Sequence, residues 1–156
     1  MRPEMYVAII ALVVAIWQGI VNRRHNRLSI KPSLRIDRCI FATKSTFIEL
    51  CNTGAGPAII KSIRVFVDAE PLPGDTRNPQ LEALSKLGLS DLQWQTYDIN
   101  PGESFGAGER HEMILLVSPI KDSKTLERVK NGLLKISYEI KYASVYGEES
   151  TLPHQW

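Results

Sequence analysis

The side chains best suited to nucleophilic chemistry are two cysteines, Cys39 and Cys51, and three histidines, His25, His111 and His154. A cysteine attacks as the thiolate when a neighbouring base removes its proton, and histidine is the usual base. No signature of a cysteine enzyme surrounds either cysteine, and the two do not form a CxxC pair, so a zinc site lacks partners. The sequence therefore predicts free, buried or half-buried thiols, with no catalytic residue, no metal and no cofactor.

A glycine-rich loop is the most informative stretch of the remaining chain. It consists of Asn52, Thr53, Gly54, Ala55, Gly56 and Pro57. Asparagine and glycine permit positive φ and proline fixes φ, so the loop ends one strand and redirects the chain into the next. The GxGxxG and GxxxxGK[ST] patterns of phosphate loops are absent, and a strand follows where a phosphate site needs a helix N-terminus. We interpret these six residues as a contact surface for a partner protein.

These residues must be positioned by a chain that begins with an apolar run. Residues 5–21 are apolar except for Gln18, and a helix of 17 residues spans about 25 Å, near the lower limit for crossing a bilayer. A cleaved signal peptide carries its positive charge before such a run, whereas here an arginine-rich stretch follows it. The run also has no polar face for a helix on a protein surface. The sequence predicts a retained single-span anchor in the lipid bilayer, with a signal peptide and a buried soluble helix as alternatives.

Three arginines, Arg23, Arg24 and Arg27, follow the apolar run. By the positive-inside rule they place the N-terminus outside and the rest of the chain in the cytoplasm. We interpret them as topology markers that also meet lipid headgroups, although lipid-binding clusters usually contain four to eight basic residues. Residues 1–28 carry a net charge of +3, while the remainder holds 15 basic and 16 acidic residues. A domain this close to neutral lacks the basic face of a nucleic-acid-binding protein, so no nucleic-acid partner is predicted.

Residues 1–28 thus form an anchor with a basic flank, and residues 29–156 are the right size for one domain. This domain shows about seven short strands, and the first two, LSIKPSLRID with its continuation to Phe41 and TFIELCN, are predicted to pair antiparallel across the turn ATKS. The clearest one has apolar residues in alternation, which predicts one buried face; they are Leu134, Ile136, Tyr138, Ile140 and Tyr142. In the strand after the glycine-rich loop, the residues predicted to share a face are Ile59, Ile63, Val65 and Val67.

Two short helices interrupt the strands. Asn78 is a candidate N-cap of the first, which carries a stripe of Leu81, Leu84 and Leu87 and closes at Gly88. The second begins after Asp122 or Ser123 and is expected to end at Asn131 and Gly132. The pattern predicts an all-β fold, an antiparallel immunoglobulin-like β-sandwich with two helical insertions, although the Cys…Trp…Cys spacing of antibody domains is absent.

The chain also resembles a family. An N-terminal span followed by RLSIKPSL, FIELCNTGAGPAIIKSIRVFVD, INPGESFGAGE and ISYEIKYASVYGEE is similar to small bacterial single-pass inner-membrane proteins with an immunoglobulin-like domain. The resemblance implies a bacterial inner-membrane location and that fold, and it supplies no catalytic residues.

Together these features predict a membrane-anchored, non-enzymatic adaptor whose β domain contacts a partner protein at the inner membrane. Assembly into a homo-oligomer is a further option. One alternative is a domain that faces the periplasm as a binding or chaperone-like module, for which a Cys39–Cys51 disulfide would be a sign. The other alternative is a cysteine-dependent enzyme.

Overall fold

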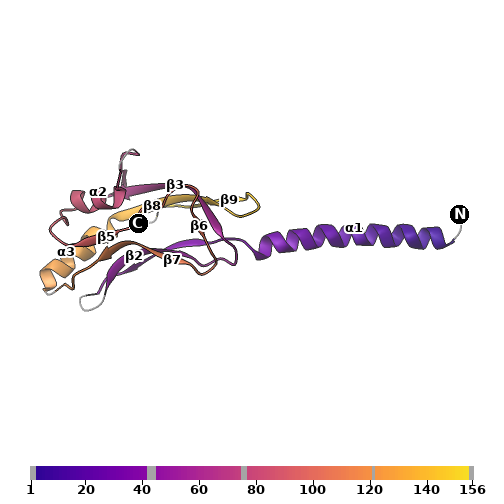
Figure 1. The fold of residues 1–156 in the computed structure, drawn as a ribbon, viewed down its shortest axis with the longest axis horizontal. Helices are drawn as coiled ribbons and strands as arrows, with labels where there is room; N and C mark the ends of the chain where they lie inside the picture. Colours follow the sequence, from indigo (N-terminus) through magenta and orange to yellow (C-terminus); the bar gives the residue numbers. More distant parts are fainter. Residues whose placement is uncertain (1–2, 42–44, 75–76, 121, 155–156) are drawn as a thin grey trace.

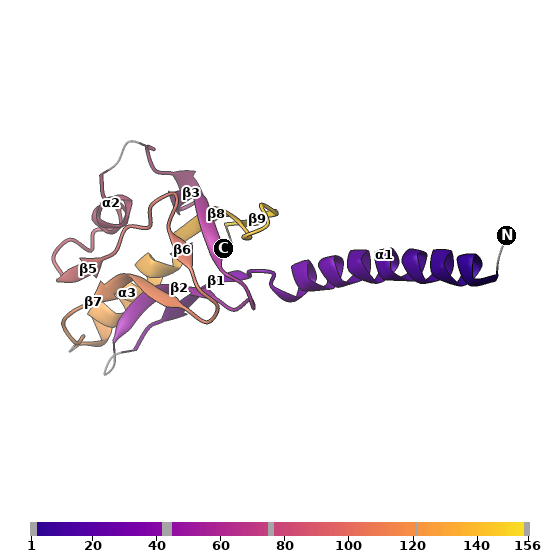
Figure 2. The same cartoon turned by 45° about the vertical axis from the view of Figure 1, so that its right-hand side comes forward.

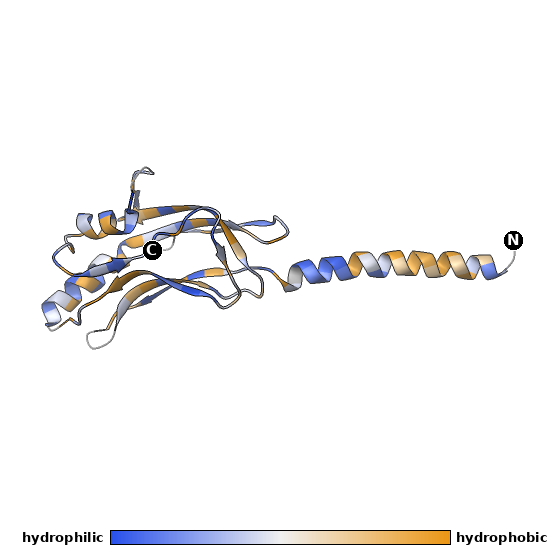
Figure 3. Ribbon diagram, viewed as in Figure 1, coloured by the Kyte–Doolittle hydropathy of each residue, from blue (hydrophilic) through white to orange (hydrophobic). Residues whose placement is uncertain are grey.

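A long helix leads into a β-rich domain in a computed structural model of the chain (Figure 1). The structure describes residues 3–41, 45–74, 77–120 and 122–154. The helix, α1 (Pro3–Ser29), projects from one end of the domain and exposes its apolar side chains. Its segment Pro3–Arg27 is long and apolar enough to span a membrane. Figure 3 shows this apolar stretch, followed by polar turns next to the domain.

Two antiparallel sheets form the domain and lie face to face (Figures 1 and 2). The first has the order β1 (Leu34–Cys39), β2 (Thr46–Asn52), β7 (Arg110–Leu116) and β5 (Trp94–Thr96). The second has the order β4 (Glu70–Pro71), β3 (Ala58–Val67), β8 (Ile136–Ala143) and β9 (Glu149–Leu152), and β6 (Ser104–Phe105) pairs with β3. Two helices complete the domain, α2 (Pro79–Lys86) and α3 (Ser123–Leu134). The fold is therefore mainly antiparallel sheet, with three helices in the described residues.

The alternation of apolar residues predicted the strand β8 correctly in its central part. Ile136, Tyr138 and Ile140 are buried between the sheets, and Tyr142 is buried beside them. Leu134 does not belong to this face, because it ends α3 and is 50% exposed. The first predicted hairpin is also confirmed, since β1 and β2 pair antiparallel with Leu34 opposite Asn52.

The predicted face of β3 is wrong at its first residue. Ile60, and not Ile59, is fully buried, while Val65 and Val67 are buried as expected. The cause is a β-bulge: Ile60 pairs with Tyr142 and Ser62 with the next residue of β8, so Lys61 is the extra residue. A bulge shifts the alternation by one position, which periodicity alone does not reveal.

Both domain helices lie at the end opposite α1 (Figure 1). Asn78 caps α2 as predicted, its side chain accepting from the Leu81 amide at 3.0 Å, but Leu81 itself faces solvent. Asp122 caps α3, which runs through Gly132 to Leu134, so the predicted end at Gly132 is wrong. A Cβ at Gly132 would lie 2.8 Å from Leu89 Cδ1. Glycine at this position therefore permits close packing of α3 against the chain that follows α2.

Candidate functional site

The side chain of Asn52 is buried at the base of the glycine-rich loop, and it hydrogen-bonds the backbone of three separate segments. Nδ2 donates to the carbonyl oxygens of Gly56 (2.8 Å), Phe105 (3.0 Å) and Gly106 (3.1 Å), and Oδ1 accepts from the amides of Ser33 (3.2 Å) and Gly54 (3.0 Å). Because buried polar groups are costly unless paired, this side chain fixes the three segments relative to one another.

The loop also grips the linker, residues 30–33, that joins α1 to β1. A Cβ at Gly54 would lie 2.4 Å from the carbonyl oxygen of Lys31, and a Cβ at Gly56 would lie 2.0 Å from that of Ile30. The Thr53 amide donates to the Ser33 carbonyl oxygen at 2.8 Å. Only glycine allows backbone to approach backbone this closely. We call residues 52–57 the clasp, because they hold the chain where it leaves α1.

The six predicted partner-contact residues differ in their exposure to solvent. Thr53 and Ala55 are exposed, whereas the other four are buried or half-buried. Sequence reasoning treated all six residues as surface and missed the packing of the glycines against the linker. A role of this loop in partner binding stays a prediction, carried on the exposed side by Thr53 and Ala55.

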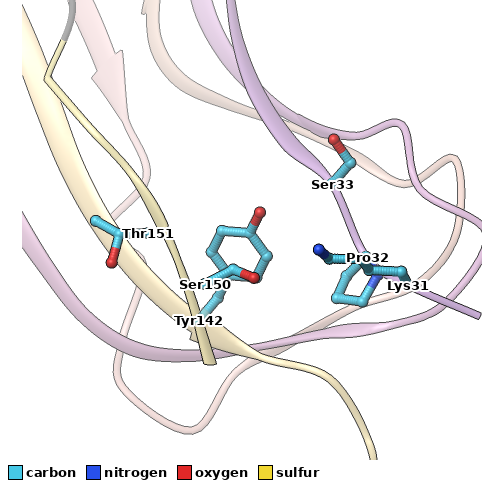
Figure 4. Close-up of a pocket in the computed structure, with 6 residues that line it drawn as sticks. All are labelled: Lys31, Pro32, Ser33, Tyr142, Ser150 and Thr151. Carbon is cyan, nitrogen blue, oxygen red and sulfur yellow. The ribbon is translucent and has the colours of Figure 1, made fainter. Parts of the chain in front are cut away.

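A groove runs beside the clasp between the free edges of the two sheets. β1 is the outer strand of the first sheet and β9 that of the second. One hollow of about 500 Å³ is lined by Lys31, Pro32, Ser33, Tyr142, Ser150 and Thr151. Figure 4 shows the linker residues facing Tyr142 and Ser150 across this opening. A second hollow of about 290 Å³ shares Ser33 in its wall and continues along β1 to Arg38, with Leu152 of β9 opposite.

Arg38 and Tyr138 line the second hollow. Arg38 lies on the inward face of β1, and its Nη2 donates to the carbonyl oxygen of Ile136 at 2.8 Å. Tyr138 is 1% exposed, and burial raises the pKa of its hydroxyl. Among the described residues, neither the Tyr138 hydroxyl nor Arg38 Nε has a hydrogen-bond partner. The alternation of β1 is the sequence signal for this inward arginine, since Arg38 occupies a position that alternates with the inward-facing Leu34 and Ile36.

The groove has a basic character. Lys31, Arg35 and Arg38 line its two hollows, and no acidic side chain of the described residues lines either one. The outer strand β1 pairs only with β2 in the described chain. An edge strand exposes unpaired backbone N–H and C=O groups that can accept a further strand. The groove therefore combines an open strand edge with positive charge.

The thiol of Cys51 belongs to a polar cluster on the outer face of the first sheet. Its Sγ lies 3.7 Å from Asp37 Oδ2, and the sulfur and the carboxylate oxygens of Asp37 and Glu49 lie within 4.8 Å of one another. Both carboxylates already pair with arginines, Arg35 at 2.6 Å and Arg110 at 2.7 Å. Burial, with a contribution from Glu49, raises the pKa of the Cys51 thiol to about 12. The thiol is therefore protonated near neutral pH and donates to carboxylates.

Both cysteines are free, and the register keeps them apart. Cys39 lies opposite Phe47, while Cys51 lies opposite Arg35, four residues along β1 from Cys39. Four strand residues span about 13 Å, which is well beyond the reach of a disulfide. The bond imagined for a periplasmic domain is excluded by this register, so its absence carries no information about topology.

The histidines lie in three different environments. His111 is register partner to Leu50, so its side chain lies on the sheet face opposite Cys51. Its Nε2 lies 2.8 Å from Glu109 Oε1, and its ring packs against Phe105 at 4.7 Å. His154 stacks on Phe66 of the second sheet. His25 lies in α1, beside Ser29, so none of these contacts forms a cysteine–histidine pair.

The basic flank, Arg23, Arg24 and Arg27, is exposed along the last turns of α1. These arginines line a cavity of about 740 Å³ together with Tyr146, from the turn between β8 and β9. Sequence reasoning found the arginines but not the tyrosine, because the contact depends on where the hairpin points.

Comparison with known proteins adds no relative. No protein-family model matches the chain, and no curated protein or solved structure is significantly similar to it. The resemblance to small bacterial membrane proteins therefore stays a prediction.

Proposed function

We propose that this chain is a membrane-anchored, non-enzymatic adaptor that captures an extended segment of a partner protein at the bacterial inner membrane. The observation that carries the proposal is the groove between the free edges of β1 and β9. An extended peptide can add to an edge strand through backbone hydrogen bonds, while pockets for alternate side chains give specificity. The clasp holds this groove beside the end of α1, so a captured segment would be kept near the membrane.

The chemistry of the groove indicates the kind of segment. Lys31 and Arg38 give it positive charge, while Leu34 and Leu152 supply apolar surface. We therefore expect an extended segment that alternates acidic and apolar side chains. Thr53, from the clasp, lines the second hollow, which links the predicted contact loop to the groove.

The proposed membrane placement is supported by the length and apolar character of α1. We infer that the helix is a retained anchor, because its flanking charge follows the apolar run instead of preceding it. The positive-inside rule places the N-terminus outside and residues 29–156 in the cytoplasm. We also assign the two-layer domain to the immunoglobulin-like β-sandwiches, on strand count and antiparallel layering.

A non-enzymatic role is supported by the state of the thiols. Cys51 is buried and protonated, and its contacts are the carboxylates of Asp37 and Glu49. Their negative charge disfavours the thiolate, which is the reactive form of cysteine. Replacing both cysteines with serine should leave partner capture intact. Loss of capture in a folded double variant would favour the cysteine-dependent alternative.

The test is purification of the C-terminally tagged full chain from native membranes in a mild detergent. We expect a stoichiometric partner to be retained. Ser33 lines both hollows, and its interactions with the clasp use only backbone atoms, so Ser33→Trp should fill the groove without breaking them. The matched control is Ser118→Trp, an exposed residue beyond β7. Partner loss in Ser33→Trp alone supports the groove.

Two outcomes would contradict the proposal. Partner capture that persists in Ser33→Trp would place the contact elsewhere. Isolation of the wild-type chain alone, or only as a homo-oligomer, would reject the adaptor function. Protease protection of the C-terminal tag in sealed inner-membrane vesicles of known orientation checks the topology separately.

A further inference from the structure

The turn between β8 and β9 presents two large apolar side chains at its apex. Val145 and Tyr146 are 50% and 43% exposed. Tight turns usually carry Gly, Pro, Asn, Asp or Ser at such positions, so a valine and a tyrosine together are unusual for a turn that faces only water. We call these two residues the hairpin apex.

The apex is held in a defined shape. Ser144 Oγ accepts from the amides of Tyr146 (3.2 Å) and Glu148 (3.3 Å), and the Gly147 amide donates to the Ser144 carbonyl oxygen (2.9 Å). Gly147 adopts a φ of +80°, which favours glycine. The turn therefore presents its apolar residues in a fixed orientation instead of folding them back onto the domain.

The apex meets the basic flank of α1. The guanidinium of Arg27 lies 5.4 Å from the centre of the Tyr146 ring, within the range of a cation–π interaction. The cavity of about 740 Å³ between them is lined by Ile20, Arg23, Arg24, Asn26, Arg27, Tyr146 and Glu148. Figures 1 and 2 show the β8–β9 hairpin pointing out of the domain on the side from which α1 projects.

The position of this cavity along α1 matches the headgroup layer of a membrane spanned by the helix. Residue 21 ends the apolar run, and Arg27 follows it by about 9 Å at 1.5 Å per helical residue. The headgroup layer beyond the hydrocarbon is about 5–7 Å thick on each side. The cavity, which extends from Ile20 to Arg27, therefore crosses the headgroup layer and reaches the edge of the hydrocarbon.

We propose that the basic flank and the hairpin apex together bind the phosphate of an anionic phospholipid headgroup, which makes the hairpin a second membrane contact. Guanidinium groups are well suited to phosphate, and tyrosine is enriched at membrane interfaces. Glu148 is the one acidic side chain among the described lining residues, and three arginines exceed its charge. The inference rests on the anchor part of the proposed function, and it requires no protein partner.

The consequence is an oriented domain. A domain held only by α1 could tilt freely against the bilayer, whereas contacts at both α1 and the hairpin apex restrict that motion. The clasp lies on the linker beside the same helix end, so the groove would keep a fixed height above the membrane.

The test uses the full chain in mild detergent with equal amounts of phosphatidylglycerol and phosphatidylcholine, read by native mass spectrometry. We expect wild type to retain phosphatidylglycerol preferentially. Arg24→Gln and Arg27→Gln should each lower the ratio of anionic to zwitterionic lipid bound by about fivefold. Tyr146→Ser, which leaves the charge unchanged, should lower it about two- to fivefold. Lys130→Gln on the exposed side of α3 is the matched charge control and should behave as wild type.

Each contrary result has a defined meaning. No preference for phosphatidylglycerol in wild type would overturn the site, and a preference unchanged in Tyr146→Ser would remove the hairpin from it. An equal loss in Lys130→Gln would show charge alone to be responsible, which also overturns the proposal. Flotation with phosphatidylcholine vesicles distinguishes failure of the membrane anchor from failure of the lipid site. If α1 is an anchor, it should carry every variant to these vesicles, whether or not the lipid site is intact.

A second measurement locates the apex directly. An environment-sensitive dye on Val145→Cys, which keeps Tyr146 in place, should be quenched by lipids that carry a quencher on the headgroup, whereas the same dye on Ser118→Cys should not. Both labels are placed in a Cys39→Ser background, since Cys39 is partly exposed. Equal quenching at the two sites, or none at residue 145, would contradict a second membrane contact.

Discussion

The two ends of the domain are held together by different physics. At the end remote from α1, apolar side chains pack: Val129 and Leu133 of α3 are fully buried in one cluster with Leu84 and Leu89. At the end next to α1, the contacts are made with backbone atoms. The side-chain amide of Asn52 donates to backbone carbonyl oxygens, and the clasp glycines, which lack a Cβ, lie against the backbone of the linker. The apolar core continues toward the near end through Leu34, Ala58 and Phe105, but only the near end adds these close backbone contacts, which fix the path of the chain.

This difference explains why the near end can set geometry. Hydrophobic packing is non-directional and adapts to small changes by moving side chains. A hydrogen bond to a fixed carbonyl is directional, and backbone in contact with backbone has no rotamer to change. The groove and the proposed lipid site depend on the orientation of the domain, and both lie beside the near end, where the contacts are directional. The helices α2 and α3 stabilise the domain at the remote end.

The largest effect on stability is expected at the remote end. Leu133→Ala removes a fully buried side chain from the core, and such changes cost about 2–5 kcal/mol of unfolding free energy. The neighbouring Leu134 is 50% exposed, so Leu134→Ala should change stability by less than about 0.5 kcal/mol. Denaturant unfolding of the full chain in mild detergent measures both. A similar loss in the two variants would contradict the packing of α3.

A smaller loss is expected from Asn52 at the near end. Asn52→Ala leaves buried carbonyl and amide groups without a partner, at a cost of about 1–3 kcal/mol. Asn52→Asp keeps an acceptor for the Ser33 and Gly54 amides but turns a carboxylate toward the carbonyl oxygens of Gly56 and Phe105. We therefore expect Asp to be worse than Ala in the same unfolding measurement at neutral pH. If Asp is tolerated better than Ala, the Nδ2 bonds do not hold this end.

A local effect is expected from Gly56. Gly56→Ala places a Cβ against the Ile30 carbonyl oxygen, and backbone must move to relieve the contact. The linker should separate from the clasp, with global stability reduced by about 1 kcal/mol, a typical effect of a single substitution. Hydrogen exchange should show the Thr53 amide, which donates to Ser33, losing protection. Gly74→Ala has open space around it and should leave protection unchanged; equal loss there would contradict the clasp.

The same division appears in what the sequence could predict. Local patterns predicted the hairpin of β1 and β2, the buried alternation of β8, and the caps at Asn78 and Asp122, because each depends on residues that are close in sequence. The apolar helix was also evident, since length and hydrophobicity suffice to recognise it.

Features that depend on distant contacts were missed. The bulge at Lys61 is specified by pairing with β8, about 80 residues later, and Gly132 lies inside α3 at a point where Leu89, distant in sequence, packs against it. The clasp was recognised as unusual from its glycines, but its target, the linker, could not be read from the loop itself. The groove needs β1 and β9 side by side, although they lie at opposite ends of the domain sequence.

The smallest effect should come from Gly132, which is the counterpart of Gly56 at the remote end. In Gly132→Ala the new Cβ meets Leu89 Cδ1 at 2.8 Å, and a leucine side chain can change its rotamer. Alanine also favours the helix over glycine by about 0.5–1 kcal/mol, which offsets the cost of repacking. We therefore expect a net change in stability near zero and no change in protection of the linker amides. A loss at Gly132 as large as that at Leu133 would mean that the remote end is as rigidly specified as the near end, and the contrast between side-chain packing and backbone contact would fail.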